Sequence, residues 1–207
     1  MLIGVLLTPA WFLPLWPSRV WQLAVAILGL PALWLAWRHA PWQPTPAAER
    51  ARILHHLGLT SDQTFADLGA GDGRLVAWVH DATGARALGW EASALPWLVA
   101  WLRLLRRPGA TVHLADLYRA DLSEVDAAYV WGTAYSVAEP RFGQRMVRAL
   151  KPGARLLSYH HPVHGLDPVA VDDDGQRPLY VYTMPPRTRV GGPEAPVGEG
   201  GGRDRAQ

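Results

Sequence analysis

Three glycines at alternate positions, Gly69, Gly71 and Gly73, directly follow a short and mostly apolar run, Thr64–Leu68. The run has the length and composition of a buried parallel strand, and helical spacing resumes at Arg74. Glycines adopt the positive φ angles of a tight turn and let a ligand lie against the backbone. The start of the following helix adds free N–H groups and the positive end of a dipole. A strand, a glycine-rich turn and a helix start in this order predict a cofactor-binding site.

The glycine spacing distinguishes between classes of cofactor. The dinucleotide-binding pattern G-x-G-x-x-G requires its third glycine at position 74, where this chain has arginine. A phosphate-binding P-loop requires Gly-Lys-Ser/Thr, which the chain lacks. What remains is an acidic residue, Asp67, followed by the three glycines. This pattern resembles the first motif of the class I S-adenosylmethionine (SAM)-dependent methyltransferases. The alternative is an ordinary strand-to-helix turn with an excess of glycine.

Acidic residues also end the next two predicted strands. Arg86–Trp90 reads as a second strand that ends at Glu91, and Thr111–Ala115 reads as a third that ends at Asp116. Ligands of open α/β sheets bind beyond the carboxyl ends of the strands, where the strand order reverses. We expect Glu91 to accept hydrogen bonds from the ribose hydroxyls, and Asp116, with the Leu117 backbone, to contact the adenine. One such acid is commonly a solvated turn residue, but three beside a glycine turn predict a binding site.

The remaining pattern supplies the elements that position these residues. Two further strands are predicted at Asp126–Trp131 and Ala154–Tyr159, and helices are predicted from Thr45, as the capping residue, to about Leu57, at Ala94–Arg106 and at Glu139–Leu150. The helix at 94–106 carries Leu95, Leu98, Leu102 and Leu105 on one face. Strands that alternate with helices predict a parallel sheet with right-handed crossovers. Val169–Val171 and Leu179–Thr183 suit a closing hairpin. The predicted fold is therefore α/β and Rossmann-like, mostly parallel with an antiparallel last strand.

An uncharged stretch of eighteen residues, Val20–Trp37, precedes this domain. At ~1.5 Å per residue a helix of that length reaches roughly 27 Å, enough to cross a bilayer core. Tryptophans lie near both of its ends, and Arg38, Arg50 and Arg52 follow it. Aromatic belts and the positive-inside tendency then predict a transmembrane anchor in the inner membrane, with the C-terminal side in the cytoplasm. A cleaved signal peptide and a buried soluble helix are the alternatives.

These features predict three regions in the chain. Residues 1–39 form a hydrophobic membrane anchor of one or two helices. Residues 40–185 form the α/β domain. Residues 186–207 are rich in glycine and proline and cannot bury a core, so we expect them to be disordered.

Composition excludes several kinds of chemistry. The chain has no cysteine, which excludes disulfides, a thiolate nucleophile and a cysteine-based zinc site. Its formal net charge of +2 is too small to indicate a nucleic-acid partner, and it lacks the Asn/Asp-Pro-Pro-Tyr/Phe motif of DNA amino-methyltransferases. His160 and His161 are adjacent, but neighbouring histidines rarely point at one centre and no third ligand stands out. We therefore expect no nucleic acid and no metal.

A family resemblance extends beyond the glycine motif. The blocks that carry it are P-T-P-A-A-E-R, D-L-G-A-G-D-G-R, L-K-P-G-A-R-L-L-S-Y and P-V-A-V-D-D-D-G-Q-R-P-L-Y-V-Y. Together they are similar to the membrane-anchored lysine methyltransferases that include the ATP synthase c-subunit enzyme, over roughly Pro41–Pro185. The resemblance implies SAM as cofactor, a membrane-protein lysine as acceptor and an N-terminal anchor. Thr45, in the Pro-Thr-Pro segment, joins the expected cofactor-binding residues. The runs G-W-E-A-S-A and W-G-T-A-Y depart from the family pattern.

The acceptor side of such a site must align the acceptor with the methyl carbon and take a proton from a lysine of reference pKa ~10.4. Candidates must follow the fourth and fifth strands, and they are Trp131, Thr133, Tyr135, His160 and His161. Trp131 or Tyr135 can wall an amine channel with a ring face, and His160 can accept a proton. The alternative is that Trp131 is a packing residue and that the two histidines belong to a loop.

The sequence therefore predicts a membrane-anchored, SAM-dependent protein-lysine methyltransferase. Two alternatives remain open. One is methylation of a lipid headgroup or a small amine, and the other is a membrane-tethered protein that binds SAM without turnover.

Overall fold

The structure is a computed structural model, and it describes residues 43–185. The predicted membrane anchor (1–39) and the predicted disordered tail (186–207) lie outside the described residues. Within residues 43–185, no helix has both the length and the apolar character needed to cross a bilayer.

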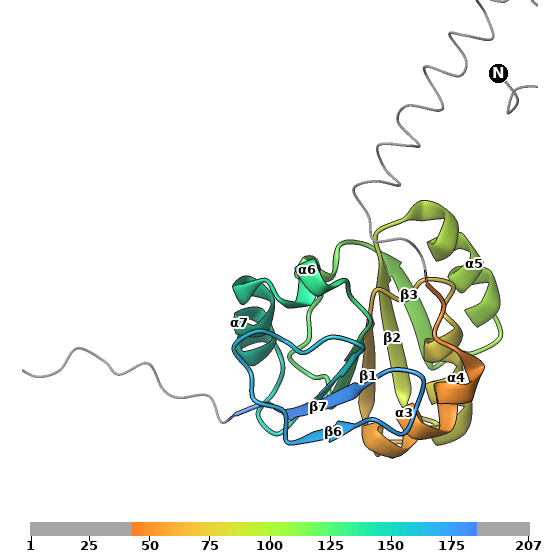
Figure 1. The fold of residues 1–207 in the computed structure, drawn as a ribbon. Helices are drawn as coiled ribbons and strands as arrows, with labels where there is room; N and C mark the ends of the chain where they lie inside the picture. Colours follow the sequence, from red (N-terminus) through yellow and green to blue (C-terminus); the bar gives the residue numbers. More distant parts are fainter. Residues whose placement is uncertain (1–42, 186–207) are drawn as a thin grey trace, which may run out of the picture.

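A seven-stranded sheet forms the centre of the described fold (Figure 1). Its strands are β1 (Thr64–Leu68), β2 (Arg86–Glu91), β3 (Ala110–Leu114), β4 (Ala127–Val130), β5 (Arg155–Tyr159), β6 (Ala170–Asp172) and β7 (Leu179–Thr183). The strand order is β3-β2-β1-β4-β5-β7-β6. Strands β1 to β5 pair in parallel, whereas β7 is antiparallel to both β5 and β6. The predicted mostly parallel sheet with an antiparallel last strand and a closing hairpin is confirmed.

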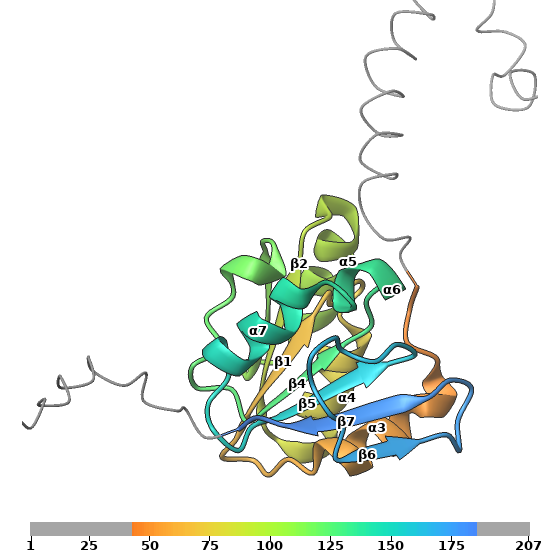
Figure 2. The same cartoon turned by 60° about the vertical axis from the view of Figure 1, so that its left-hand side comes forward.

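Helices cover both faces of this sheet, as Figures 1 and 2 show. The helical elements are η2 (Ala47–Glu49), α3 (Arg50–Leu57), α4 (Arg74–Thr83), α5 (Ala94–Leu104), η3 (Leu117–Arg119), α6 (Ala134–Val137) and α7 (Pro140–Ala149). One core lies between the sheet and α3, α4 and α5, and includes Phe65 and Val76. The other lies under α7 and includes Phe142 and Met146. Strand β1 contributes side chains to both cores, because successive residues of a strand face opposite sides of the sheet.

The start of the first helix differs from the sequence expectation. Thr45 does not cap it, because Pro46 holds the N-cap position without a side-chain bond and the first turn is 3-10. The Thr45 hydroxyl instead lies 3.3 Å from the Tyr129 hydroxyl, and this contact joins the first described segment to β4. Gly58 ends α3 in the left-handed conformation, as predicted.

Helix α5 turns its leucine-rich face outward. Leu95, Leu98 and Leu102 are exposed, while Ala100 and Leu104 are buried against the core. Ala100, a small residue on the inner side, lets the helix approach Gly73 of the glycine loop closely, while most of the large apolar side chains of the helix remain on the outside of the fold. The predicted common face exists, but none of its leucines is buried in the described fold.

Candidate functional site

A cavity of about 640 Å³ opens at the carboxyl edge of the parallel strands. Its walls come from the loops that follow β1, β2, β3, β4 and β5, and the strand order reverses between β1 and β4. Both its size and its position are those of small-molecule sites in open α/β sheets. All but one of the predicted site residues line it: Thr45, Asp67, Gly69, Gly71, Glu91, Asp116, Leu117, Trp131, Tyr135 and His160.

The glycine loop between β1 and α4 adopts the conformation that its sequence predicts. Gly69, Gly71 and Gly73 have φ angles of 109°, 53° and 71°. The N–H groups of Gly69 and Ala70 both donate to the carbonyl of Trp90, at 3.0 and 2.9 Å, which fixes the loop to β2. A Cβ atom at Gly69 would have no neighbour within 4 Å. The loop therefore leaves open space beside the backbone on the cavity side.

Gly73 is the predicted site residue that does not line the cavity. A Cβ atom there would lie 2.8 Å from the Cβ of Ala100 on α5. A glycine is needed at position 73 for the positive φ angle and for the close approach of α5, and not for contact with a ligand.

Glu91 holds the glycine loop as well as facing the cavity. Its Oε2 accepts from the Gly71 N–H at 2.9 Å, and its Oε1 accepts from the Ser93 N–H at 2.8 Å. An ionised carboxylate has about four acceptor positions, so about two remain for ligand hydroxyls. The predicted role at a ribose is therefore compatible with the bonds that Glu91 already makes.

Asp67 is a buried acid without a partner. Its carboxylate makes no hydrogen bond to any other residue of the range 43–185, although only 4% of its surface is exposed. Burial, together with the nearby charges of Glu91 and Asp72, raises the pKa of Asp67 to about 8. An unpaired acid at the wall of a cavity fits a cationic or hydrogen-bond-donating ligand.

Asp72, inside the glycine loop, is a site residue that the sequence reasoning missed. Its Oδ2 accepts from Arg74 and from Arg103 of α5, both at 2.8 Å. Burial by itself would raise the pKa of Asp72, but the bond from Arg74 and the charges of Arg103 and Arg74 lower it below its usual value. The loop is thus attached to α5 by an ion pair between residues 31 positions apart, which the sequence pattern does not reveal.

The predicted adenine-side residues follow β3 at the cavity wall. Asp116 lies two residues beyond the strand, which ends at Leu114. Its side chain accepts from the Tyr118 N–H at 2.9 Å and caps the short helix η3 that starts at Leu117. Asp116 is exposed and Leu117 half-buried, so both remain accessible from the cavity.

The predicted acceptor-side residues lie together at the opposite wall. Trp131 is half-buried and packs edge-on against Tyr159, with ring centroids 4.9 Å apart. Thr133 caps helix α6 by accepting from the Ser136 N–H. Tyr135, on that helix, is 91% exposed and lies at the rim. Trp131 thus combines packing with cavity contact, while Tyr135 is held by no surrounding residues of the described fold.

His160 has a strained backbone and a cationic neighbour. Its φ angle is 81°, a value that residues other than glycine rarely adopt. Its Nε2 lies 2.6 Å from Nη1 of Arg177, and its ring centroid lies 3.9 Å from that of His161. Burial, His161 and Arg177 together lower the pKa of His160. A neutral ring that accepts from Arg177 at Nε2 carries its proton on Nδ1, so Nδ1 is the donor and Nε2 the acceptor.

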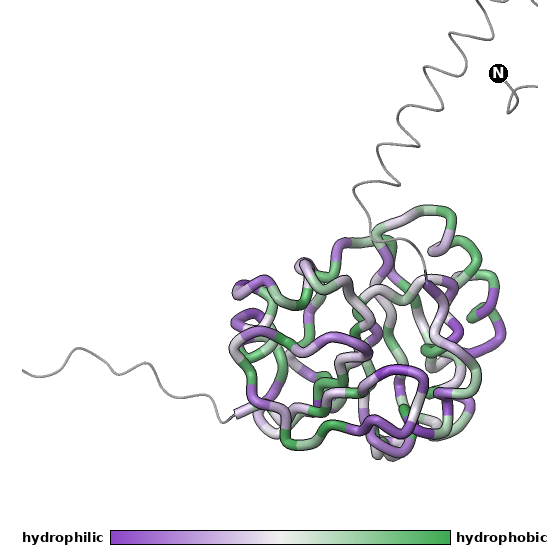
Figure 3. The backbone as a smooth tube through the Cα atoms, viewed as in Figure 1, coloured by the Kyte–Doolittle hydropathy of each residue, from purple (hydrophilic) through white to green (hydrophobic). Residues whose placement is uncertain are grey.

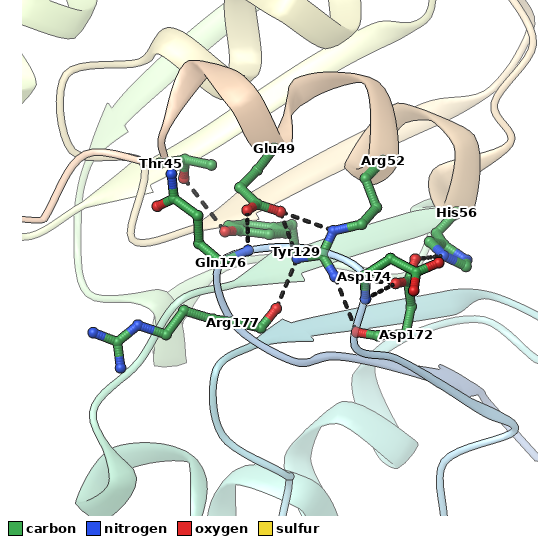
Figure 4. Close-up of polar contacts among 9 residues, drawn as sticks. All are labelled: Thr45, Glu49, Arg52, His56, Tyr129, Asp172, Asp174, Gln176 and Arg177. Atoms are coloured by element: carbon green, nitrogen blue, oxygen red, sulfur yellow. Dashed lines mark hydrogen bonds and ion pairs between the residues drawn. The ribbon is translucent and has the colours of Figure 1, made fainter.

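A partly buried charge cluster connects the closing hairpin to α3 beside the cavity (Figure 4). Glu49 accepts from Arg52 at 2.8 Å and from the Gln176 N–H at 2.7 Å. Arg52 also donates to Asp172 and to the Arg177 carbonyl, at 3.2 and 2.7 Å. The cluster holds the loop that carries Arg177 at the cavity. The sequence analysis assigned none of these residues to the site: Arg52 was named only among the arginines after the apolar segment, and the others occur only within the family blocks.

Comparisons with known proteins agree with this geometry. No protein-family model matches the chain. Over 125 residues the chain is 33% identical to the adenine nucleotide translocase lysine N-methyltransferase of Mus musculus; the match covers 58% of this chain and 53% of the mouse protein, so the chain spans about half the length of that relative. Over 154 residues it is 27% identical to a protein-lysine N-methyltransferase of Saccharolobus islandicus, covering 70% of this chain and 94% of that protein.

Solved structures share the fold. An RNA methyltransferase from Salinibacter ruber, in complex with S-adenosyl-L-homocysteine, aligns with a TM-score of 0.65 at 23% identity, over 72% of this chain and 98% of that one. A putative methyltransferase from Escherichia coli aligns with a TM-score of 0.59 at 15% identity, over 71% and 90%.

The chain has the fold of the class I SAM-dependent methyltransferases, and the class predicted from its glycine motif is confirmed. Within that class, the two sequence relatives above are lysine N-methyltransferases. The predicted cofactor agrees with the S-adenosyl-L-homocysteine bound by the Salinibacter ruber protein.

Proposed function

We propose that this protein is a membrane-attached, SAM-dependent methyltransferase that modifies a lysine of a membrane protein. The observation that carries the proposal is the cavity in which the glycine loop meets carboxylates from three successive strands. The two lysine methyltransferase relatives support the choice of acceptor.

The residues present fit SAM, which supplies an electrophilic methyl group on a sulfonium. Glu91 keeps free acceptor positions for the ribose hydroxyls. Asp116 and the Leu117 backbone are accessible for the adenine, and the unpartnered Asp67 carboxyl is available to the amino group of the methionine part. The open side of Gly69 leaves room for the ligand along the loop.

The acceptor amine must arrive neutral and in line with the methyl group. Trp131 presents an aromatic ring to the cavity and Tyr135 stands at its rim, so both are placed to guide an alkylammonium by ring-face attraction. His160 is the candidate proton acceptor: its lowered pKa keeps the ring neutral at neutral pH, and the unprotonated nitrogen is Nε2, which must exchange its bond from Arg177 for the proton of the acceptor. Catalysis then depends mainly on alignment.

Membrane attachment is proposed from the sequence. Val20–Trp37 is long enough to span a bilayer, and arginines follow it at positions 38, 50 and 52. This arrangement supports an inner-membrane anchor with the α/β domain on the cytoplasmic side, where SAM is made.

Titration calorimetry of the purified full-length protein with SAM tests the cofactor step. We expect the wild-type protein to bind SAM. Gly71→Arg should abolish binding, because a large side chain at this left-handed position would enter the cavity. Gly153→Arg is a matched control, since Gly153 also has a positive φ angle but lies away from the cavity. Absence of SAM binding by the folded wild-type protein would contradict the proposal.

A further inference from the structure

The outer face of α5 carries a stripe of large apolar side chains that the described fold leaves exposed. Its members, between 41% and 74% exposed, are Leu95, Leu98, Val99, Trp101, Leu102 and Leu105. Spacings of three and four residues place them on one side of the helix. Figure 3 shows hydrophobic colouring along α5, although the helix lies on the outside of the fold. Monomeric soluble proteins rarely expose such a contiguous apolar surface without a partner for it.

The start of α5 and the start of the described chain border the same cavity. Gln43 and Pro44 line the cavity together with Ser93 and Pro96, which stand at the start of α5. Only residues 38–42 separate Gln43 from the apolar segment 20–37. Five extended residues reach at most about 17 Å. The chain that follows the apolar segment therefore enters the fold at the cavity that the start of α5 also borders.

We infer that the α5 stripe contacts the interfacial layer of the bilayer that holds the protein. This inference rests on the membrane attachment proposed above. The stripe has the composition of an interfacial helix, with leucines beside a tryptophan and arginines 103, 106 and 107 at the C-terminal end. Arg106 is exposed and forms no ion pair with any residue of the described range. It is therefore free to meet an anionic headgroup.

Two other binding partners for the α5 stripe, the segment 20–37 and a second copy of the chain, fit it less well. The segment 20–37 is apolar on every side, so packing it against α5 would leave most of its own surface in water. A second copy is also a poor fit, because α5 has 11 residues and is therefore only about 16 Å long. One face of so short a helix offers far less than the roughly 800 Å² per partner that a standard protein interface buries.

Bilayer contact at α5 would orient the site. Arg103 of α5 donates to the carbonyl and to the carboxylate of Asp72, both at 2.8 Å, and these bonds tie the helix to the cofactor loop. Pro96 and the exposed Tyr135 both line the cavity. With α5 lying on the headgroups, the cavity that Pro96 borders would lie beside the membrane surface, where a lysine at the edge of a membrane protein is presented.

The test uses single introduced cysteines, since the natural chain has none. Full-length Leu102→Cys and Leu98→Cys, each labelled with an environment-sensitive fluorophore, are reconstituted into vesicles of phosphatidylcholine and phosphatidylglycerol with brominated acyl chains. We expect a blue shift and loss of most of the emission at both positions. Val169→Cys is the matched control: Val169 is 65% exposed, beside β6 at the far edge of the sheet, and its label should keep its emission.

Equal emission from positions 102 and 169 in vesicles that carry the protein would overturn the inference. Energy transfer between copies labelled at position 102, without lipid quenching, would assign the face to a second copy and also overturn it. Failure to float with the vesicles would contradict membrane attachment and the inference together. SAM binding by the same labelled protein is read separately, because Leu102 does not line the cavity. Quenching without SAM binding would count against the proposed enzyme and not against the α5 contact.

Discussion

At the scale of single residues, the site depends on carboxylates whose environments differ sharply. Asp67 is buried without a hydrogen-bond partner in the described range, Asp72 is paired with two arginines, and Glu91 is bonded to two backbone N–H groups. Desolvation dominates at Asp67 and raises its pKa, while ion pairing outweighs desolvation at Asp72 and lowers its pKa. The pKa values of Asp67 and Asp72 are therefore shifted in opposite directions, although both residues line one cavity.

Asp67 should make the stability of the unliganded protein depend on pH. Its pKa is about 8 in the folded state against 3.8 as the reference value, so the folded state binds the extra proton between these limits. Stability from this group is complete below about pH 4 and is lost as the pH rises to about 8. The free energy of unfolding of Asp67→Asn should therefore increasingly exceed that of the wild type across this range, by roughly 3–5 kcal/mol at pH 8. Urea unfolding at several pH values measures the difference, and a difference that does not change with pH would contradict the prediction.

The pKa of His160, the candidate base, is lowered in part by Arg177, which lies 17 positions later in the chain. Arg177 reaches it only because the charge cluster of Glu49, Arg52 and Asp172 holds the closing hairpin against α3. Sequence reasoning proposed His160 from its position after the fifth strand. It could not identify Arg177, because that contact depends on the packing of a hairpin loop.

At the scale of elements, the closing hairpin and α3 are held together by Asp172. Burial opposes its ionisation, but bonds from the Asp174 N–H, His56 and Arg52 outweigh it and lower the pKa of Asp172 to about 2. Its ionised form therefore stabilises the fold above about pH 4, and this stabilisation is lost as the pH falls toward 2.

Asp172→Asn should accordingly destabilise the protein by roughly 1–2 kcal/mol at pH 7, since it weakens charge-assisted bonds. The variant and the wild type should converge near pH 2. Asp173→Asn changes the net charge equally at an exposed neighbour and serves as the control. Chemical denaturation at pH 7 and at low pH measures both, and equal effects of the two substitutions would show that the cluster adds nothing specific.

The glycine loop and α5 are packed too closely for any side chain at position 73. Gly73→Ala would place a Cβ 2.8 Å from Ala100 and would also strain a left-handed residue. We expect a loss of roughly 2–4 kcal/mol in the free energy of unfolding. Gly153→Ala has a similar φ of 80° but open space around it, so it should lose only about 1 kcal/mol. Denaturant midpoints at an unchanged m-value measure the difference, and equal losses would show that packing against α5 is unimportant.

Sequence patterns predicted the strands well and the shortest helices poorly. The bounds of β1 and β7 agree with the prediction, because turn residues flank each apolar run. Helix α6 and the 3-10 helix η3 were missed, since each has only three or four residues and depends on one capping side chain, Thr133 or Asp116. The outward face of α5 was also missed. Periodicity shows that a face exists but not what it packs against.

At the scale of the whole molecule, the order of the strands brings the site together. Asp67, Glu91 and Asp116 come from β1, β2 and the loop after β3, which are neighbours in the sheet, and Trp131 and His160 follow β4 and β5 on the other side of the switch point. Alternating strands and helices were enough to predict this arrangement, because parallel strands end at one edge. The cofactor side was therefore predictable from the sequence. The acceptor side depends on loops and on a hairpin whose contacts the sequence pattern does not specify.

The reaction proposed for this site is the transfer of a methyl group from SAM to a lysine of a membrane protein. Its most direct test incubates the purified full-length protein with membranes from its own host lacking the gene and with SAM that carries a deuterated methyl group. Mass spectrometry then follows the label in proteins and in extracted lipids. We predict deuterated methyl-lysine in a membrane protein, absent with Gly71→Arg. Label in a lipid headgroup, or SAM binding without release of S-adenosylhomocysteine, would contradict the claim.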